Sequence, residues 1–348
     1  MTDIHWERYP LIAQQKHTRT WLQIQGNLGL AANTVEAYGR ALEGYLRFCQ
    51  NQGITPETAS REQLSCYVHD LISRPNPRGT KIRVLDSGVG LANATLQQYL
   101  TAVRLWYDSL IEESIRETNP VGRGRYTPGK GFSGARDRGL IPRYKKLPWL
   151  PSEEQWRAIL EAAKGEPLRN RLMLAIAYDA GLRREELCAL FTGDIDPAHR
   201  MIRVRAETTK NMLERMVPYS EAPAALYAAY LQERRLLSRS RGPLFLSESE
   251  RNLAAPITIW TWSKVVKSIA ERADVQQFTT HTPRHLCLTD LARCGWDIHE
   301  IALFAGHRSI QTSLLYSHLS GRELGAKIER GMASLHSWRT KMIEEALS

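Results

Sequence analysis

A basic, glycine-rich stretch at residues 122–147 limits what this chain can fold into more than any other feature. It contains eight lysines and arginines, one acidic residue, Asp137, and few apolar side chains. Such a segment cannot bury enough apolar surface to offset the entropy lost on ordering, so it is a poor candidate for any core. The chain of 348 residues is also longer than one core usually supports. We therefore predict two domains joined by a linker.

The same stretch supplies most of the chain's net charge of +10. Residues 1–121 hold equal numbers of basic and acidic side chains, whereas residues 122–147 carry a net charge of +7. An isolated basic run is usually a solvated connector without a partner. The other interpretation is a segment that lies along the phosphates of a nucleic acid, which attract lysine and arginine.

Composition excludes several classes of protein. The hydrophobic share of 43% is ordinary for a globular chain. No apolar run approaches the ~18 residues that cross a bilayer, and the N-terminus lacks the pattern of a signal peptide, so we expect a cytoplasmic protein with no membrane partner. The five cysteines are scattered without CxxC spacing, which favours reduced thiols: Cys49, Cys66, Cys188, Cys287 and Cys294.

Residues 1–121 show helical periodicity. Asn33 is expected to cap one helix, a second is expected over residues 61–72, and Asn93 is expected to cap a third. Their apolar stripes indicate core rather than functional surface. Residues 21–28 are ambiguous, and residues 75–90 are loop-like with room for a short hairpin.

Residues beyond the linker are expected to form helices and two short strands. Arg183 directly follows the most apolar run, and an arginine in a core is costly unless it meets an anion. A bound phosphate would satisfy it, and so would Glu186. One expected helix begins after Ser152, and three others cover residues 172–179, 222–237 and 257–273. The two expected strands flank Lys210.

Residues 281–316 combine histidine, arginine and tyrosine side chains on three expected helices that Gly295 and Gly306 separate. Thr282 is expected to cap the first helix, so that His281 stands just outside its N-terminus. The unpaired backbone N–H groups and partial positive charge of a helix N-terminus suit a phosphate.

The later part of this segment follows the same pattern. Asp297 is expected to cap the second helix and Ser309 the third. Tyr316 falls two positions beyond Leu314, which belongs to the apolar face of the third helix. We therefore expect Tyr316 to project to another side with its hydroxyl free.

These residues resemble the tyrosine recombinases, also called the phage-integrase family. That family carries a histidine three residues before an arginine, which here are His281 and Arg284. Further along it carries a glycine-histidine pair with the nucleophilic tyrosine nine residues later. The matching positions are Gly306, His307 and Tyr316.

Two upstream motifs extend the resemblance. The family's Gly-Leu-Arg box followed by Glu-Leu is similar to GLRREEL here, with Arg183 as its arginine and Glu186 as a supporting residue. Its lysine on a β-hairpin, in a pattern like GKxxKxRxVP, matches Lys210 in TKNMLERMVP. Thr209 replaces the glycine and Leu213 replaces the second lysine, so Lys210 is the least secure match.

The resemblance spans roughly residues 15 to 325 and implies a mainly α fold with a small β-sheet. It implies an N-terminal helical core-binding domain of the SAM-like type and an α/β catalytic domain of the DNA breaking-rejoining type. The expected parts are residues 1–121, the linker 122–147, the catalytic domain 148–321 and a C-terminal tail 322–348. The tail's apolar side is expected to dock on a neighbouring protomer, with packing on its own domain as the alternative.

The resemblance also implies a chemistry that needs neither metal nor ATP. Arg183 and Arg284 would clamp the nonbridging oxygens of a DNA phosphate, since guanidinium groups bind phosphate in a bidentate way. His281 and His307 would donate hydrogen bonds to the developing charge. Tyr316 would attack phosphorus to give a 3′-phosphotyrosine, which conserves the energy of the broken bond, and Lys210 would protonate the departing 5′ oxygen.

The partner implied is double-stranded DNA with specific recombination sites. The family acts as four protomers on two duplexes, and the sequence leaves accessory proteins open. With DNA as partner, the linker is expected to lie along its phosphates. The expected DNA contacts are Arg40, Arg47 and Arg104 in the helical domain, and Arg136, Arg138, Lys145 and Lys146 in the linker.

Other functions were weighed against an integrase, transposase or dimer resolvase. A type IB topoisomerase shares the chemistry but would not need a docking tail. A catalytically idle DNA-binding protein would not need every reactive position filled. His281 and His285 have a zinc-like spacing, but HTPRH is not HExxH and has no nearby third ligand.

Overall fold

The computed structural model describes residues 3–74, 91–122, 140–141 and 147–319. The chain separates into two compact units, Met1–Lys146 and Leu147–Ser348. The predicted mainly α fold with a small β-sheet is confirmed. Within the described residues, no helix is long and apolar enough to cross a membrane. Most of the predicted linker and all of the predicted tail lie outside the described residues, so both stay predictions.

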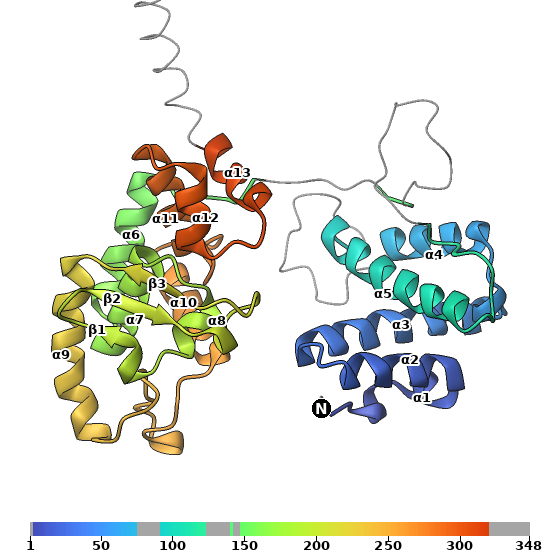
Figure 1. Ribbon diagram of the computed structural model, residues 1–348, viewed down its shortest axis with the longest axis horizontal. Helices are drawn as coiled ribbons and strands as arrows, with labels where there is room; N and C mark the ends of the chain where they lie inside the picture. Colours follow the sequence, from blue (N-terminus) through green and yellow to red (C-terminus); the bar gives the residue numbers. More distant parts are fainter. Residues whose placement is uncertain (1–2, 75–90, 123–139, 142–146, 320–348) are drawn as a thin grey trace, which may run out of the picture. The chain divides into compact units, whose positions relative to one another are not determined.

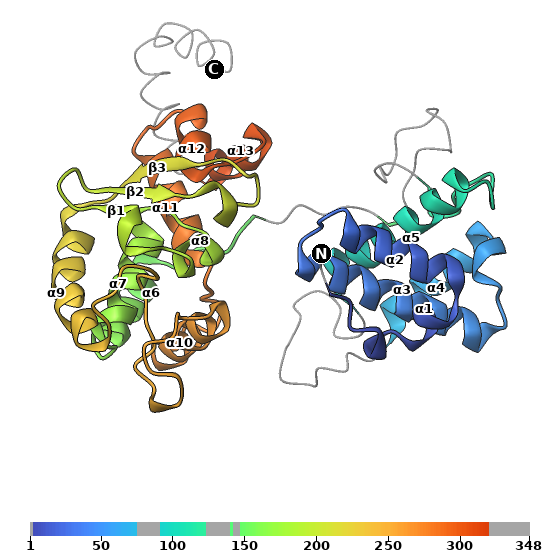
Figure 2. The ribbon, with the colours of Figure 1, turned by 60° about the horizontal axis from the view of Figure 1, so that its bottom comes forward.

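The first unit is a bundle of helices around an aromatic core (Figures 1 and 2). The two longest helices pack against each other, and the hydroxyls of Tyr45 and Tyr107 lie 2.6 Å apart between them. The sequence left residues 21–28 ambiguous, and most of them belong to a helix. The α-helices are α1 (Pro10–Gln14), α2 (Lys16–Asn27), α3 (Ala32–Gln52), α4 (Arg61–Ser73) and α5 (Asn93–Glu112).

Two helices of this bundle start differently from the prediction. Asn33 and Asn93 were expected as caps, but both lie inside helices whose N-caps are Ala31 and Ala92. The carbonyls of those alanines accept the first helical hydrogen bonds, from Val35 and from Leu96. The backbone therefore closes the first turn without a side-chain cap.

The second unit packs helices around a three-stranded antiparallel sheet of order β1-β2-β3. Most of helix α7 is buried, and it packs against α9 and α11. The sequence missed β1, which has only two residues. The elements are β1 (Ile195–Asp196), β2 (Met201–Val204), β3 (Arg215–Pro218), α6 (Glu153–Lys164), α7 (Leu168–Asp179), α8 (Arg184–Cys188), α9 (Glu221–Leu237), α10 (Ile259–Arg272), α11 (Thr282–Arg293), α12 (Ile298–Ala305) and α13 (Ile310–Leu319).

Helices α11, α12 and α13 lie side by side, and α12 contacts β3 (Figures 1 and 2). Asp297 caps α12 in a capping box with Glu300, as its position predicted. Thr282, the expected cap, is instead the first residue of α11, and His281 is the N-cap. The Thr282 hydroxyl accepts a hydrogen bond from the Thr279 amide. The packing of these three helices on one another, and of α12 on β3, positions the candidate site residues.

Candidate active site

Two tight turns bring Arg183 to the end of α12. Gly181 takes a φ of +56°, and a Cβ there would lie 3.0 Å from the ring of Phe304, so this turn admits only glycine without strain. Arg183 follows as the N-cap of α8, and its Nη2 donates to the Gly306 carbonyl over 3.0 Å. Gly306 itself takes a φ of +60° and ends α12.

Glu186 is the anchor of this corner. Its side chain has no exposed surface and accepts from Arg183 Nη1 over 2.7 Å and from the Arg183 amide over 3.0 Å. Arg215 adds two donors, at 3.1 and 2.7 Å. Burial alone would raise the pKa of Glu186, but the hydrogen bonds and charges of the two arginines outweigh it and lower this pKa to about 2. The carboxylate therefore stays ionised and fixes both guanidinium groups.

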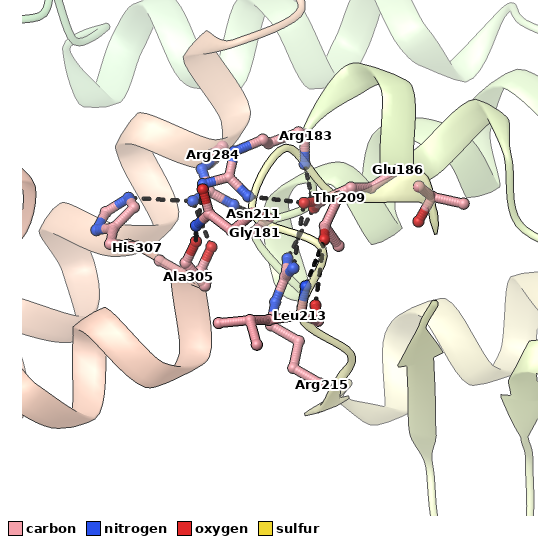
Figure 3. Close-up of polar contacts among 12 residues, drawn as sticks. Gly181, Arg183, Glu186, Thr209, Asn211, Leu213, Arg215, Arg284, Ala305 and His307 are labelled. Atoms are coloured by element: carbon pink, nitrogen blue, oxygen red, sulfur yellow. Dashed lines mark hydrogen bonds and ion pairs between the residues drawn. The ribbon is translucent and has the colours of Figure 1, made fainter. Parts of the chain in front are cut away.

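Arg215 is a site residue that the sequence reasoning missed. It lies on β3 and points toward Glu186 (Figure 3). Its Nε also donates to the Phe304 carbonyl over 3.0 Å, so it ties the sheet to α8 and α12. A Cβ at Gly306 would lie 2.9 Å from its Nη1. The hairpin pattern that pointed to Lys210 also contains this arginine, which was the available signal.

Arg284 lies almost fully buried, with 4% exposed, in the first turn of α11. Its guanidinium donates to the carbonyls of Gly181 and Ala305, and its Nη2 lies 3.1 Å from Nε2 of His307. Burial, reinforced by the nearby charge of Arg183, lowers its pKa to about 10, so it remains a cation at neutral pH. Figure 3 shows Arg183 and Arg284 next to each other.

The hydrogen bonds of His307 define its tautomer. Arg284 can only donate, so Nε2 is the acceptor and the proton lies on Nδ1, which is 2.8 Å from the Ser313 hydroxyl. Burial, followed by the charges of Arg284 and Arg183, lowers the pKa of His307 to about 3. His307 is therefore neutral in the absence of a bound anion.

Tyr316 corrects an expectation from the sequence. Its hydroxyl was expected to be free, but the residue is only 2% exposed and the hydroxyl lies 3.0 Å from Nδ1 of His285. Its ring stacks on His307 at 6.0 Å between centroids and lies 5.9 Å from that of His285. The reason is that α13 packs on both α11 and α12, which encloses the side of the helix that carries Tyr316. Burial raises the pKa of its phenol, which Arg284 and Arg183 partly oppose.

His281 and Lys210 lie at the edge of this cluster. His281 is exposed at the N-terminus of α11, yet enough protein surrounds its ring that loss of hydration lowers its pKa, which Glu185 opposes. Lys210 is exposed in the turn between β2 and β3, and among the described residues it has no hydrogen-bond or ion-pair partner. Its neighbour Asn211 donates to the Gly306 carbonyl over 3.1 Å, which tethers this turn to the site.

The structure thus brings together five of the predicted residues and places two near them. Two fixed guanidinium groups, a neutral imidazole and a phenol suit a phosphate ester under attack by the phenol. Within the described residues no group of His, Cys, Asp or Glu could hold a metal ion. The five are Arg183, Glu186, Arg284, His307 and Tyr316.

The expected DNA-contacting arginines of the first unit differ in their surroundings. Arg40 and Arg47 are exposed on α3 and pair with Glu36 and Glu43 one turn earlier. Arg104 is half-buried, and its Nε is buried without a hydrogen-bond partner in the described structure. The expected contacts of the linker lie outside the described residues: Arg136, Arg138, Lys145 and Lys146.

The chain is similar to known proteins. Residues 150–323 match the model of the phage integrase family. Tyrosine recombinase XerC of Pelotomaculum thermopropionicum is 30% identical over 248 residues, covering 68% of this chain and 74% of that protein. Tyrosine recombinase XerD of Halalkalibacterium halodurans is 24% identical over 304 residues, covering 84% and 89%.

Solved structures share the fold. The XerH site-specific recombinase bound to its palindromic difH substrate superposes with a TM-score of 0.63 at 20% identity, covering 85% of this chain and 80% of that one. The Tn1549 transposon integrase in complex with transposon right end DNA gives a TM-score of 0.62 at 18% identity, covering 92% and 98%.

Proposed function

The chain belongs to the phage integrase family of tyrosine recombinases, and we propose that it recombines DNA at specific sites by breaking and rejoining strands through Tyr316. One observation carries the proposal. The phenol of Tyr316 lies against His307, whose ring is hydrogen-bonded to the buried guanidinium of Arg284. The nucleophile is therefore in ring contact with an imidazole that is bonded to one of the two fixed guanidinium groups.

Fixed cations are what a DNA phosphodiester requires. Its negative charge repels a nucleophile, and donors that are already oriented stabilise the additional charge of the transition state. Arg183 is held by Glu186 and the Gly306 carbonyl, and Arg284 by two carbonyls. Each guanidinium has five N–H donors, so both retain donors for the nonbridging oxygens. His281, at the N-terminus of α11, is proposed to add a hydrogen bond from the edge.

The proposed reaction balances without a cofactor. The Tyr316 hydroxyl gives up its proton to water as its oxygen bonds to phosphorus and forms a 3′-phosphotyrosine, while the bond from phosphorus to the 5′ oxygen breaks and that oxygen takes up a proton. We assign the proton for that oxygen to Lys210. Its exposure in the β2–β3 turn, and the tether of that turn through Asn211 to Gly306, support the assignment. Attack by the 5′ hydroxyl of another strand then reverses the step.

The proposed partner is double-stranded DNA with specific sites, bound by both units. Arg40, Arg47 and the basic linker are assigned to its phosphates. Four protomers on two duplexes, acting in the cytoplasm, are part of the proposal. Relatives named as Xer recombinases and a transposon integrase both match, so integration, transposition and dimer resolution remain alternatives for the biological role.

A nicked suicide substrate tests the function. Cleavage beside the nick releases a short fragment and traps the covalent protein–DNA adduct. The wild-type protein should form this adduct and Tyr316→Phe should form none, although it still binds DNA. Tyr219→Phe is the matched control, because the Tyr219 hydroxyl is buried and has no hydrogen-bond partner in the described structure. An adduct with the Tyr316→Phe variant would place the nucleophile elsewhere.

A further inference from the structure

The hydrogen bond between Tyr316 and His285 has no role in the chemistry described above. His285 lies one residue after Arg284, in the first turn of α11, and its Nδ1 is 3.0 Å from the phenol oxygen. No hydrogen bond joins that oxygen to Arg183, Arg284 or His307 in the described structure. The nucleophile is therefore held by a group outside the phosphate-binding cluster.

The direction of this hydrogen bond follows from the charge states of the pair. Burial raises the pKa of the Tyr316 phenol and the charge on Arg284 only partly opposes this, so the hydroxyl keeps its proton. Burial, with the nearby His281 and Arg284, lowers the pKa of His285 to about 4, so this ring is neutral. The phenol donates and Nδ1 accepts, which leaves the proton of the imidazole on Nε2.

In this position the phenol cannot attack DNA. Reacting atoms must approach to about 3–3.5 Å with open access to the phosphorus. Tyr316 is only 2% exposed, because its ring contacts those of His285 and His307 where α13 packs on α11 and α12. The hydroxyl has to leave this enclosure before a phosphodiester can reach it.

We propose that His285 is a positioning residue that holds the Tyr316 hydroxyl in a buried resting position until DNA binds. The proposal rests on the proposed function, in which Tyr316 is the nucleophile. His285 contacts neither the phosphate nor the leaving group. It acts through Tyr316, and the hydrogen bond to Nδ1 breaks when the phenol moves to the phosphate held by Arg183 and Arg284.

The expected effect is set by the net contribution of one hydrogen bond, which corresponds to about a fivefold change in an equilibrium. Without the Nδ1 acceptor, the exposed state of Tyr316 should be populated about fivefold more in the absence of DNA. Three variants separate the acceptor from the packing of the ring. His285→Leu removes the acceptor, His285→Asn places an oxygen close to the former Nδ1, and His285→Gln places it closer to the former Nε2.

Tyrosine nitration measures this exposure directly. The full-length protein without DNA is treated with tetranitromethane, and peptide mass spectrometry gives the rate at each tyrosine. We expect Tyr316 to be nitrated about fivefold faster in His285→Leu and His285→Gln, and at the wild-type rate in His285→Asn. The fully buried Tyr230 of the same unit should stay unchanged and reports any general loosening.

Two results would overturn the inference. One is an unchanged rate at Tyr316 in both His285→Leu and His285→Gln. The other is an equal rate in His285→Gln and His285→Asn, two amides with the same risk of misfolding, which decides the matter even if leucine loosens the unit. The nitration assay contains no DNA, so its failure leaves the suicide-substrate test of Tyr316→Phe unaffected, and the failure of that test is recognised separately.

Discussion

Replacing Glu186 by glutamine would test how the two arginines of the site are held. Glutamine has nearly the shape of a protonated glutamate, so the substitution removes the charge with little change in volume. Arg183 and Arg215 both pair with this carboxylate, and their side chains are only 22% and 10% exposed. Without Glu186, the enclosed corner would contain two cations and no anion.

The magnitude follows from the pKa of the buried carboxyl. The folded protein lowers it from an ordinary value of 4.5 to about 2. At 1.36 kcal/mol for each pKa unit, the charged form is favoured by about 3 kcal/mol over the neutral form that glutamine imitates. This agrees with the ~3–5 kcal/mol that loss of one partner of a buried ion pair costs. We expect Glu186→Gln to lower the unfolding free energy of the second unit by about 3 kcal/mol.

Buried cysteines allow each unit to be followed separately. Cys287 belongs to the core of the second unit and Cys49 to that of the first. Pulsed alkylation in increasing urea, read by peptide mass spectrometry, gives the unfolding curve at each thiol. Glu186→Gln should shift the curve at Cys287 to lower urea and leave the curve at Cys49 in place. Formation of the DNA adduct should also slow by about 10- to 100-fold, since Arg183 would lose its anchor.

Glu185→Gln is the matched control. Glu185 is the neighbouring residue on α8, but it is 47% exposed and pairs with Arg184 at the surface. Exposed pairs contribute about 0–1 kcal/mol, so this variant should change the curve at Cys287 very little. Equal effects of the two substitutions, or a loss below about 1 kcal/mol for Glu186→Gln, would refute the idea that the buried carboxylate organises the site.

Three further predictions concern the turn, the proton donor and pH. Gly306→Ala should destabilise the second unit by more than 1 kcal/mol, because the left-handed φ of +60° is strained for alanine, and should slow the formation of adduct, because the Cβ would meet Arg215. Gly295→Ala is the control: its φ is +87° but its Cβ would enter open space, so adduct formation should not slow. Lys210→Ala should cleave a normal substrate far more slowly but a 5′-bridging phosphorothiolate almost normally, because sulfur leaves without a proton, whereas equal defects on both would exclude Lys210 as the acid. The folded protein lowers the pKa of His307 from 6.5 to about 3, so between these pH values the unfolded chain binds one more proton than the folded protein. The unfolding free energy of the second unit should therefore fall by about 2 kcal/mol from pH 7 to pH 5 because of His307. If the urea unfolding curve at Cys287 depends on pH as strongly in His307→Asn as in the wild type, this explanation is wrong.

The sequence predicted the site best where residues stand at the ends of helices. Arg183, Arg284 and His307 follow helix and turn signals at the spacing of the family, and the structure brings them together. Asp297 as a cap and Gly306 as a helix end were readable for the same local reason. Local signals are sufficient there because capping and left-handed turns depend on a few adjacent residues.

The direction of a side chain and its partners far along the chain could not be predicted from the sequence. The direction of Tyr316 depends on α13 packing against α11 and α12 at once, which the periodicity of one short helix does not define. Arg215 and His285 acquire their roles only from partners at a distance, Glu186 and Tyr316, which lie 29 and 31 positions away. Strand β1 has only two residues, which is too short to show the alternation of apolar and polar side chains that marks a strand in a sequence.

The most direct test of the whole account is the chemical identity of the trapped adduct. The adduct from a suicide substrate would be digested with protease and nuclease, and tandem mass spectrometry would locate the modified residue and the linked nucleotide. We predict a nucleotide joined through its 3′ phosphate to Tyr316, and a free 5′ hydroxyl on the released strand. A nucleotide on any other residue, or a link through a 5′ phosphate, would contradict the account.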